Sequence, residues 1–214
     1  MNQETIKRDF KLFGHGENSV TFQLFSSMNK RQLRRFLSNA DWASFNPNIK
    51  EAAIQEVHLF PCFGKAKGYG EPDIIILSSG RVIYVEVELA FLDKGKLPKQ
   101  FVKQMKKFTL LANDICGSSK KRITKKFSEH YEFRGQQKLR SLYAKIKKEK
   151  RKPYFLVISN SIMKNVNASY LQKKLTHAGL IAKNFSLGWI NFNKINKMKG
   201  LSKVIKTINF NLRD

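Results

Sequence analysis

The strongest constraint on the fold is a pair of apolar segments separated by turn-forming residues. Residues 73–78 (DIIILS) are apolar almost throughout, which is typical of a buried strand. Ser78, Ser79 and Gly80 favour a tight turn. Residues 81–90 (RVIYVEVELA) are rich in β-branched and aromatic side chains with a period of two. The chain therefore predicts a β-hairpin around which the other elements must be arranged.

Segments with helical spacing lie on both sides of this hairpin. Apolar residues between Asn18 and Ala40 recur at a spacing that predicts one long helix or two short ones. The second half of residues 51–60 favours a strand. Pro98 suits the first turn of a helix, and the apolar residues after it predict a helix that runs to about Ile115.

The remaining elements come from the second half of the chain. They are a strand, a helix that stops at Gly179 and a second strand, at residues 154–159, 170–177 and 181–192. This order predicts an α/β fold with a mixed central sheet and helices on both faces. We expect a single domain over 1–214, with its core at about 17–115 and 153–192 and a basic insertion at 118–152 that is exposed as helix or loop.

The charge of the chain indicates a polyanionic partner. Lys and Arg number 41 against 16 Asp and Glu, a formal net charge of +25. The basic residues are spread over helices and loops and are not gathered beside an apolar anchor, which favours nucleic acid over a membrane surface. Two distant cysteines, no apolar stretch of the ~20 residues that cross a bilayer and no signal-peptide core predict a soluble cytoplasmic protein.

Three acidic residues of the hairpin are candidates for a metal site. Glu86 and Glu88 share one face of their strand, because side chains alternate along a strand. The tight turn places Asp73 across from them, and carboxylates this close need a compensating proton or cation, of which a hard divalent metal is the natural choice. We expect Asp73, Glu86 and the backbone carbonyl of Val87 to hold Mg²⁺, for which Mn²⁺ can substitute.

Pro72 and Asp73, a twelve-residue interval spanning the hairpin, and the Glu86-Val87-Glu88 triplet together resemble the motif of the PD-(D/E)XK nuclease superfamily. The resemblance covers about residues 17–110. It implies a restriction-endonuclease-like αβββαβ core, metal-dependent cleavage of nucleic acid, and an additional site glutamate on the first helix, matched in position by Glu17. Because the motif is short and degenerate, its order and context carry most of its specificity.

The chain departs from the superfamily pattern at Glu88, because that position is usually lysine. Glu88 could bind a second metal or orient water, as some restriction endonucleases of the superfamily also have glutamate there. A lysine of the following segment could replace it, the candidates being Lys94, Lys96, Lys99 and Lys103. A catalytically dead site is the third explanation. Gln100 and Gln104 resemble glutamines that some members place near the site.

Simpler interpretations compete with these assignments. Glu86 and Glu88 could be the solvent face of an edge strand, and Glu17 could serve only the helix macrodipole. Glu56 would be a second-row acid if its strand is adjacent. The expected contacts to nucleic-acid phosphates are Lys65, Lys67, Lys96, Lys99, Lys103, Gln104, Lys120, Lys121 and Arg122.

The leading hypothesis is a Mg²⁺-dependent endonuclease that hydrolyses DNA phosphodiester bonds, of a restriction, resolvase or transposon and phage type. Asp73, Glu86, Glu88 and Glu17 are its candidate catalytic residues. A DNA-binding protein that kept the nuclease fold without the chemistry is one alternative, and an RNA-directed nuclease is another. Cleavage of both strands would favour a twofold homodimer.

Overall fold

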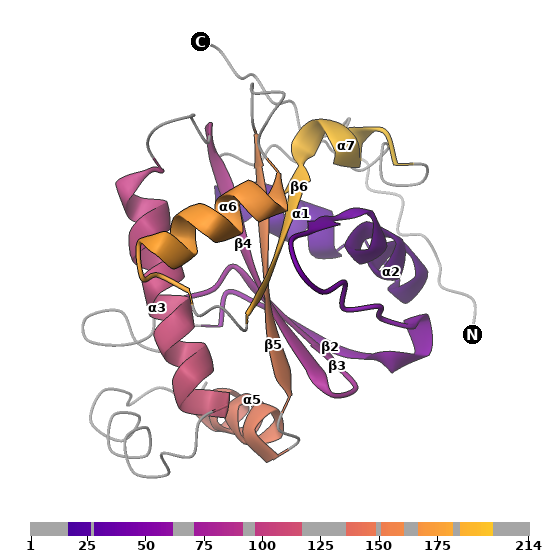
Figure 1. Cartoon of the computed structure of the whole chain (residues 1–214). Coiled ribbons are helices and arrows are strands. Elements are labelled where there is room, and N and C mark those ends of the chain that lie inside the picture. Colours follow the sequence, from indigo (N-terminus) through magenta and orange to yellow (C-terminus); the bar gives the residue numbers. More distant parts are fainter. Residues whose placement is uncertain are drawn as a thin grey trace.

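The computed structural model describes residues 17–26, 28–61, 71–91, 97–116, 136–148, 151–160, 167–181 and 185–198. In this part of the chain the central element is a six-stranded sheet in the order β1-β6-β5-β4-β3-β2 (Figure 1). Strand β3 is antiparallel to its neighbours β2 and β4, whereas β4, β5 and β6 run parallel. The strands are β1 Asp41–Trp42, β2 Ile54–Leu59, β3 Ile74–Ser78, β4 Arg81–Phe91, β5 Lys152–Asn160 and β6 Ser186–Asn191.

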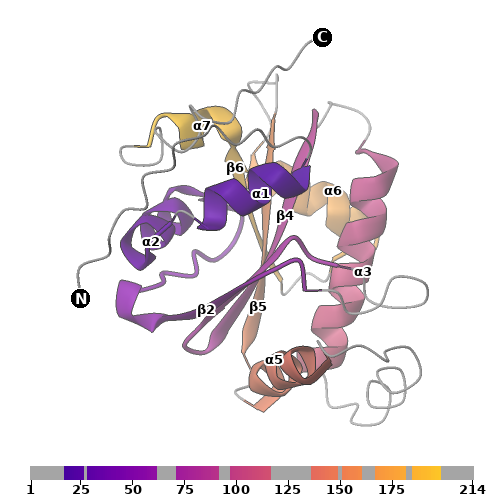
Figure 2. The ribbon, with the colours of Figure 1, turned by 180° about the vertical axis from the view of Figure 1, so that it is seen from behind.

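Helices cover both faces of the sheet, so the predicted α/β class with a mixed sheet is confirmed (Figures 1 and 2). One face packs against α3 (Lys99–Cys116), α5 (Gln136–Lys148) and α6 (Ala168–His177), and we call it the α3 face. The opposite face, which we call the α2 face, packs against α1 (Glu17–Ser26), α2 (Lys30–Asn39) and α7 (Phe192–Asn196). No helix in the described ranges is long and apolar enough to cross a membrane.

The predicted hairpin is confirmed as β3 and β4. Its register pairs Ile74 with Val85 and Ser78 with Arg81. The turn at Ser79 and Gly80 needs a positive φ, which Gly80 adopts at +67° and which glycine tolerates without a steric penalty. Local turn chemistry and alternation are therefore sufficient to set this register.

The first helical region is divided into two helices at Asn29. Its side chain accepts a hydrogen bond from the Gln32 N–H, and the Gln32 side chain accepts one from the Asn29 N–H, both at 2.9 Å. This capping box starts α2 afresh, and Leu33, Phe36 and Leu37 then anchor the helix in the core. Of the two arrangements predicted for this region, the structure has two short helices.

The prediction that the basic segment 118–152 is exposed is wrong for its later part. Leu142 and Ile146 of α5 are buried in the core of the α3 face. Arg151 is 1% exposed, and its guanidinium donates hydrogen bonds to the backbone carbonyl of Ser78 and to the Gln55 side chain. The lysine-rich composition did not predict the amphipathic helix or the buried arginine, because their burial depends on partners elsewhere in the chain.

In the second half, the end of α6 agrees with the prediction, whereas the start of the next strand does not. Gly179 stops α6 as expected, with φ +67° and the Leu180 N–H bonded to the Leu175 carbonyl at 2.8 Å. The following strand begins at Ser186, whereas it was predicted to begin at Ile181. Ile181 is nevertheless buried, so the apolar run reflected core packing and not extended pairing.

Candidate functional site

Glu86 and Glu88 lie on the same side of the sheet. On β4, Val82 and Tyr84 belong to the core of the α3 face, whereas Val85 and Val87 belong to the opposite core. Because side chains alternate, Glu86 and Glu88 continue the α3 face toward the end of the strand. The apolar lining of this face therefore gives way to carboxylates where β4 ends.

Asp73 is fixed beside these glutamates from two directions. It directly precedes β3, so the register that pairs Ile74 with Val85 brings it next to Glu86. The Val87 N–H donates a hydrogen bond to Asp73 Oδ2 at 2.7 Å. The Asp73 carbonyl accepts another at 2.8 Å from the N–H of Phe60, at the end of β2. We call Asp73, Glu86 and Glu88 the acidic cluster.

Burial excludes the interpretation that Glu86 and Glu88 are the solvent face of an edge strand. Strand β4 lies between β3 and β5, and each of the two glutamates is 8% exposed. Asp73 is half-buried. Charged carboxylates that are nearly removed from water need compensation, which hydrogen bonds or a cation can provide.

Polar residues of two further strands extend the acidic cluster. Ser159 of β5 pairs in register with Glu88, and Asn191 of β6 pairs with Ser159. Ser159 is fully buried, and its Oγ accepts a hydrogen bond from the Trp189 indole N–H at 2.9 Å. Neither residue was predicted from the sequence, because each lies beside the acidic cluster only through the parallel registers of β4, β5 and β6.

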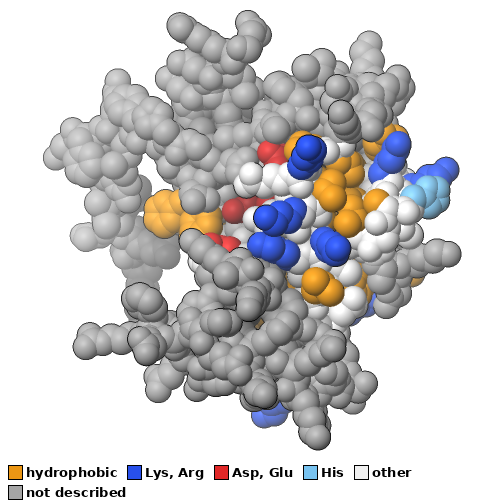
Figure 3. Space-filling model, turned by 90° about the vertical axis from the view of Figure 1, so that its left-hand side faces the viewer, with side chains coloured by type: hydrophobic (Ala, Val, Ile, Leu, Met, Phe, Trp, Pro, Cys, Tyr) orange, Lys and Arg blue, Asp and Glu red, His pale blue; other side chains and the backbone are white. Residues whose placement is uncertain are grey.

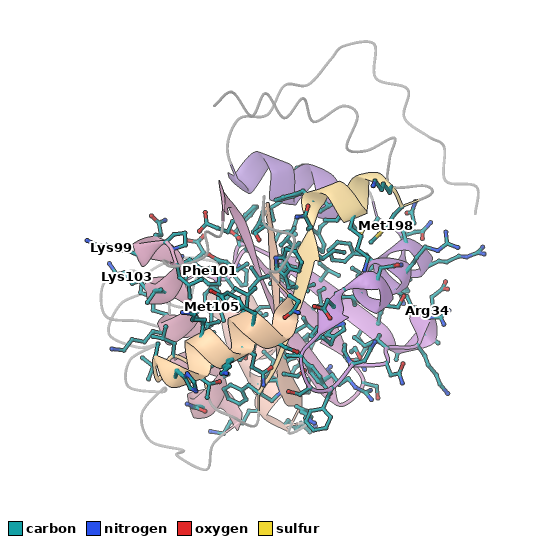
Figure 4. All side chains as sticks on the ribbon, turned by 45° about the horizontal axis from the view of Figure 1, so that its top comes forward. Arg34, Lys99, Phe101, Lys103, Met105 and Met198 are labelled. Carbon is teal, nitrogen blue, oxygen red and sulfur yellow. The ribbon has the colours of Figure 1, made fainter. Side chains whose placement is uncertain are left out.

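Helix α3 presents different residues to the sheet and to solvent. Phe101 and Met105 point toward the sheet, whereas Lys99 and Lys103 project outward (Figure 4). The hypothesis that Lys99 or Lys103 takes the place of the family lysine is therefore not supported. Gln104 is half-buried on the flank of the helix. On the side of the molecule where α3 lies, acidic side chains are at the border of a group of Lys and Arg side chains (Figure 3).

Of the other predicted site residues, Glu56 lies apart from this cluster and the side chains of the rest lie outside the described residues. Helix α1 packs through Leu24 and Phe25 on the α2 face, and the Glu17 side chain lies outside the described residues, so its role at the site stays a prediction. Glu56 lies on the adjacent strand β2 but is bonded to Lys145 of α5, several residues from Asp73 in register. The other candidates outside the described ranges are Lys65, Lys67, Lys94, Lys96, Lys120, Lys121 and Arg122.

The oxygen atoms at the cluster are of the kind that Mg²⁺ prefers. Within the described ranges no group of three or more His, Cys, Asp and Glu side chains is arranged to hold a metal ion. A bound cation would thus depend on the carboxylates of Asp73 and Glu86, a backbone oxygen and water. The Val87 carbonyl is suitable, since N–H and C=O of one residue point to the same side of a strand and its N–H points at Asp73.

Comparisons with known proteins gave no match to a family model, to a curated protein or to a solved structure. The functional interpretation therefore depends on the residues of the cluster and on the fold that positions them.

Proposed function

We propose that this chain is a divalent-metal-dependent endonuclease that hydrolyses phosphodiester bonds in DNA. The observation that carries the proposal is the hydrogen bond from the Val87 N–H to Asp73 Oδ2. It fixes a carboxylate at the start of β3 beside Glu86 and Glu88, which share its face of the sheet. The two halves of the PD-(D/E)XK-like motif are thus next to each other.

The order of the elements supports a restriction-endonuclease-like core. Helix α1 is followed by the antiparallel strands β2, β3 and β4, then by α3, and then by β5, which is parallel to β4. This is the α-β-β-β-α-β sequence that the resemblance implies. Helices α2 and α5 and the short strand β1 are additions to it.

Each acidic residue has a distinct part in the proposed reaction. Asp73 and Glu86 would hold the cation, and the Val87 carbonyl would be a third oxygen donor. When bound, Mg²⁺ or Mn²⁺ supplies Lewis-acid stabilisation of the phosphate and lowers the pKa of attacking water. The Val87 N–H keeps Asp73 in one orientation, so little reordering is needed on binding. Glu88, which is nearly buried at the end of the acidic cluster, orients the attacking water or contributes a further ligand to the metal.

The basic surface supports a nucleic-acid substrate. Lys99, Lys103 and Lys106 are exposed on one stripe of α3, whose inner face covers the same side of the sheet as the acidic cluster. Phosphates contacting these lysines would neutralise part of the net charge of +25. DNA is the proposed substrate, and RNA is the comparison that the assay must include.

A second candidate function is favoured by one observation. Glu88 occupies the position where the superfamily usually has lysine, and Lys99 and Lys103 project outward from α3. A chain that kept the fold but lost hydrolysis would bind DNA with a steep dependence on salt and without a metal requirement. Such a chain would be a DNA-binding protein.

Cleavage assays separate the two candidates. The purified protein is incubated with supercoiled, linear and branched DNA, and with RNA, in Mg²⁺, Mn²⁺ or EDTA. The endonuclease proposal expects metal-dependent nicks that disappear in Asp73→Asn and persist in Glu51→Gln, which removes one exposed acid elsewhere. DNA binding without cleavage in any metal favours the second candidate. Undiminished cleavage by Asp73→Asn contradicts the assigned site.

A further inference from the structure

The solvent side of α2 carries a concentrated positive charge. Lys30, Arg31, Arg34 and Arg35 are all exposed on a helix of 10 residues, and the helix contains no acidic residue. None of these side chains forms an ion pair among the described residues. The acid that follows the helix, Asp41, instead accepts a hydrogen bond from the Ala168 N–H at the start of α6, at 2.7 Å.

This charge opposes the stability of the helix that carries it. Lys30 and Arg34, like Arg31 and Arg35, are four positions apart, where like charges destabilise a helix by ~0.2–0.5 kcal/mol per pair. Lys30 and Arg31 also lie in the first turn, where the macrodipole favours acids. The capping box and the buried Leu33, Phe36 and Leu37 hold the helix in spite of this repulsion. The fold gives no reason for these cations, whereas an anionic partner does.

The basic side of α2 is remote from the acidic cluster. Helix α2 packs on one face of the sheet through its apolar residues, whereas Glu86 and Glu88 belong to the other face. Arg34 projects on the opposite side of the molecule from Lys99 and Lys103 (Figure 4). A straight segment of nucleic acid bound along α3 would therefore not reach Arg34.

We propose that Arg31, Arg34 and Arg35, with Lys30, form a second surface for the phosphate backbone of DNA, separate from the stretch at the acidic cluster. Guanidinium groups suit phosphate because they donate paired hydrogen bonds. A membrane surface is a poorer partner, because the apolar side of α2 is buried and the large exposed hydrophobic residues of the described chain lie outside this helix. The inference takes from the proposed function only that DNA is the partner.

The test measures DNA binding without cleavage. Fluorescence anisotropy of a labelled 40-base-pair duplex is recorded in EDTA over a range of KCl concentrations. The variant R31Q/R34Q/R35Q is compared with K148Q/K173Q/K174Q, which removes the same charge from exposed positions of α5 and α6. The α2 variant should lower the slope of log K against log salt by roughly 2 to 3, since each lost phosphate contact removes ~0.9. Its Kd near physiological salt should rise about tenfold more than that of the control.

Each outcome has a defined meaning. Equal losses in the two triple variants would show a diffuse charge effect and overturn the proposal. A loss of binding to phosphatidylserine vesicles, with DNA binding unchanged, would also overturn it. Thermal melting guards against misfolding, and the α2 variant should melt at or above the wild-type temperature because repulsion is relieved. A third outcome is that the wild-type protein binds DNA, that the α2 variant loses this binding more than the control does, and that no metal supports cleavage. This outcome would uphold the α2 surface and contradict the endonuclease proposal.

Discussion

The backbone N–H of Val87 donates a hydrogen bond of 2.7 Å to Asp73 Oδ2, so a side chain continues the pairing of β3 and β4 beyond the first residue of β3. The bond makes Asp73 part of the strand pairing and part of the acidic cluster at the same time. Substitutions at this position can separate the two roles.

Asp73→Asn should leave the fold intact and remove metal-dependent cleavage. The asparagine carbonyl oxygen can still accept from the Val87 N–H, but the charge that attracts a cation is lost. We expect cleavage to fall by roughly two orders of magnitude or more, and the melting temperature to change little. Asp73→Ala, which also removes the acceptor, should additionally cost about 1 kcal/mol of unfolding free energy. Equal stability of the two variants would contradict the structural role.

Glu88→Gln separates the enzyme from the DNA-binding protein. If Glu88 orients water or completes the ligand set, its neutral form should lower kcat by about 10- to 100-fold and leave the Kd for DNA within roughly twofold. Single-turnover cleavage and anisotropy binding measure the two quantities on the same duplex. A variant as active as the wild type would remove Glu88 from the site.

Arg151 should be one of the most sensitive positions for stability. Its guanidinium donates to the carbonyls of Ser78 and Arg81 and to the side chain of Gln55, linking β2, the hairpin and the start of β5. Arg151→Ala leaves the carbonyl of the buried Ser78 without this donor and removes a fully buried side chain, which should cost about 2–4 kcal/mol in urea unfolding. Lys148→Ala, at an exposed position of α5, should cost less than ~0.5 kcal/mol.

The protein should lose a small part of its stability at acid pH because of Glu56, which lies on the edge strand β2. The hydrogen bond from Lys145, and a second contact with His58 at 2.9 Å, lower the pKa of Glu56 below its ordinary value of 4.5. Because this pKa is lowered in the folded state, the contribution of Glu56 to the free energy of unfolding is complete above pH 4.5. It is lost as the pH falls through the pKa of Glu56 in the folded protein. Glu56→Gln should therefore lower the free energy of unfolding at pH 7 by less than about 1 kcal/mol, since the carboxylate is partly exposed. The difference between the variant and the wild type should disappear below pH 4.5. Glu51→Gln, which removes an exposed carboxylate outside this contact, is the matched control.

Gly188→Ala should strain the junction between β6 and β1. A Cβ at this position would lie 2.8 Å from the Trp42 ring, which also donates its indole N–H to the Leu37 carbonyl at the end of α2. Overpacking of this kind costs about 1–3 kcal/mol. In a Trp42→Leu background the same substitution should cost much less, and an unchanged penalty would argue against the contact.

The features that were predicted correctly depend on neighbours in the sequence. The hairpin was predictable because the Ser79–Gly80 turn and the alternation of residues 81–90 act locally. The shared face of Glu86 and Glu88 follows from the same alternation. Both conclusions needed no knowledge of what covers the sheet.

The features that were missed depend on distant partners. The two-residue strand β1 has no pattern of its own, and it exists because Asp41 pairs with Trp189 of β6. The burial of Arg151 requires acceptors on β2 and the hairpin. Ser159 joins Glu88 only through the parallel register of β4 and β5. A sequence pattern cannot supply a pairing between segments so far apart.

The segment around β1 has a consequence for folding during synthesis. Asp41 caps α6, and Phe45 exchanges backbone hydrogen bonds with the Ser186 hydroxyl, 141 positions later in the chain. Strands β3 and β4 of the hairpin can pair within a few residues of emerging from the ribosome, whereas β1 cannot pair until β6 has been synthesised. Until then the free edge of β5 is an open template for other strands. Aggregation of chains arrested before Ser186 should therefore exceed that of the full-length protein.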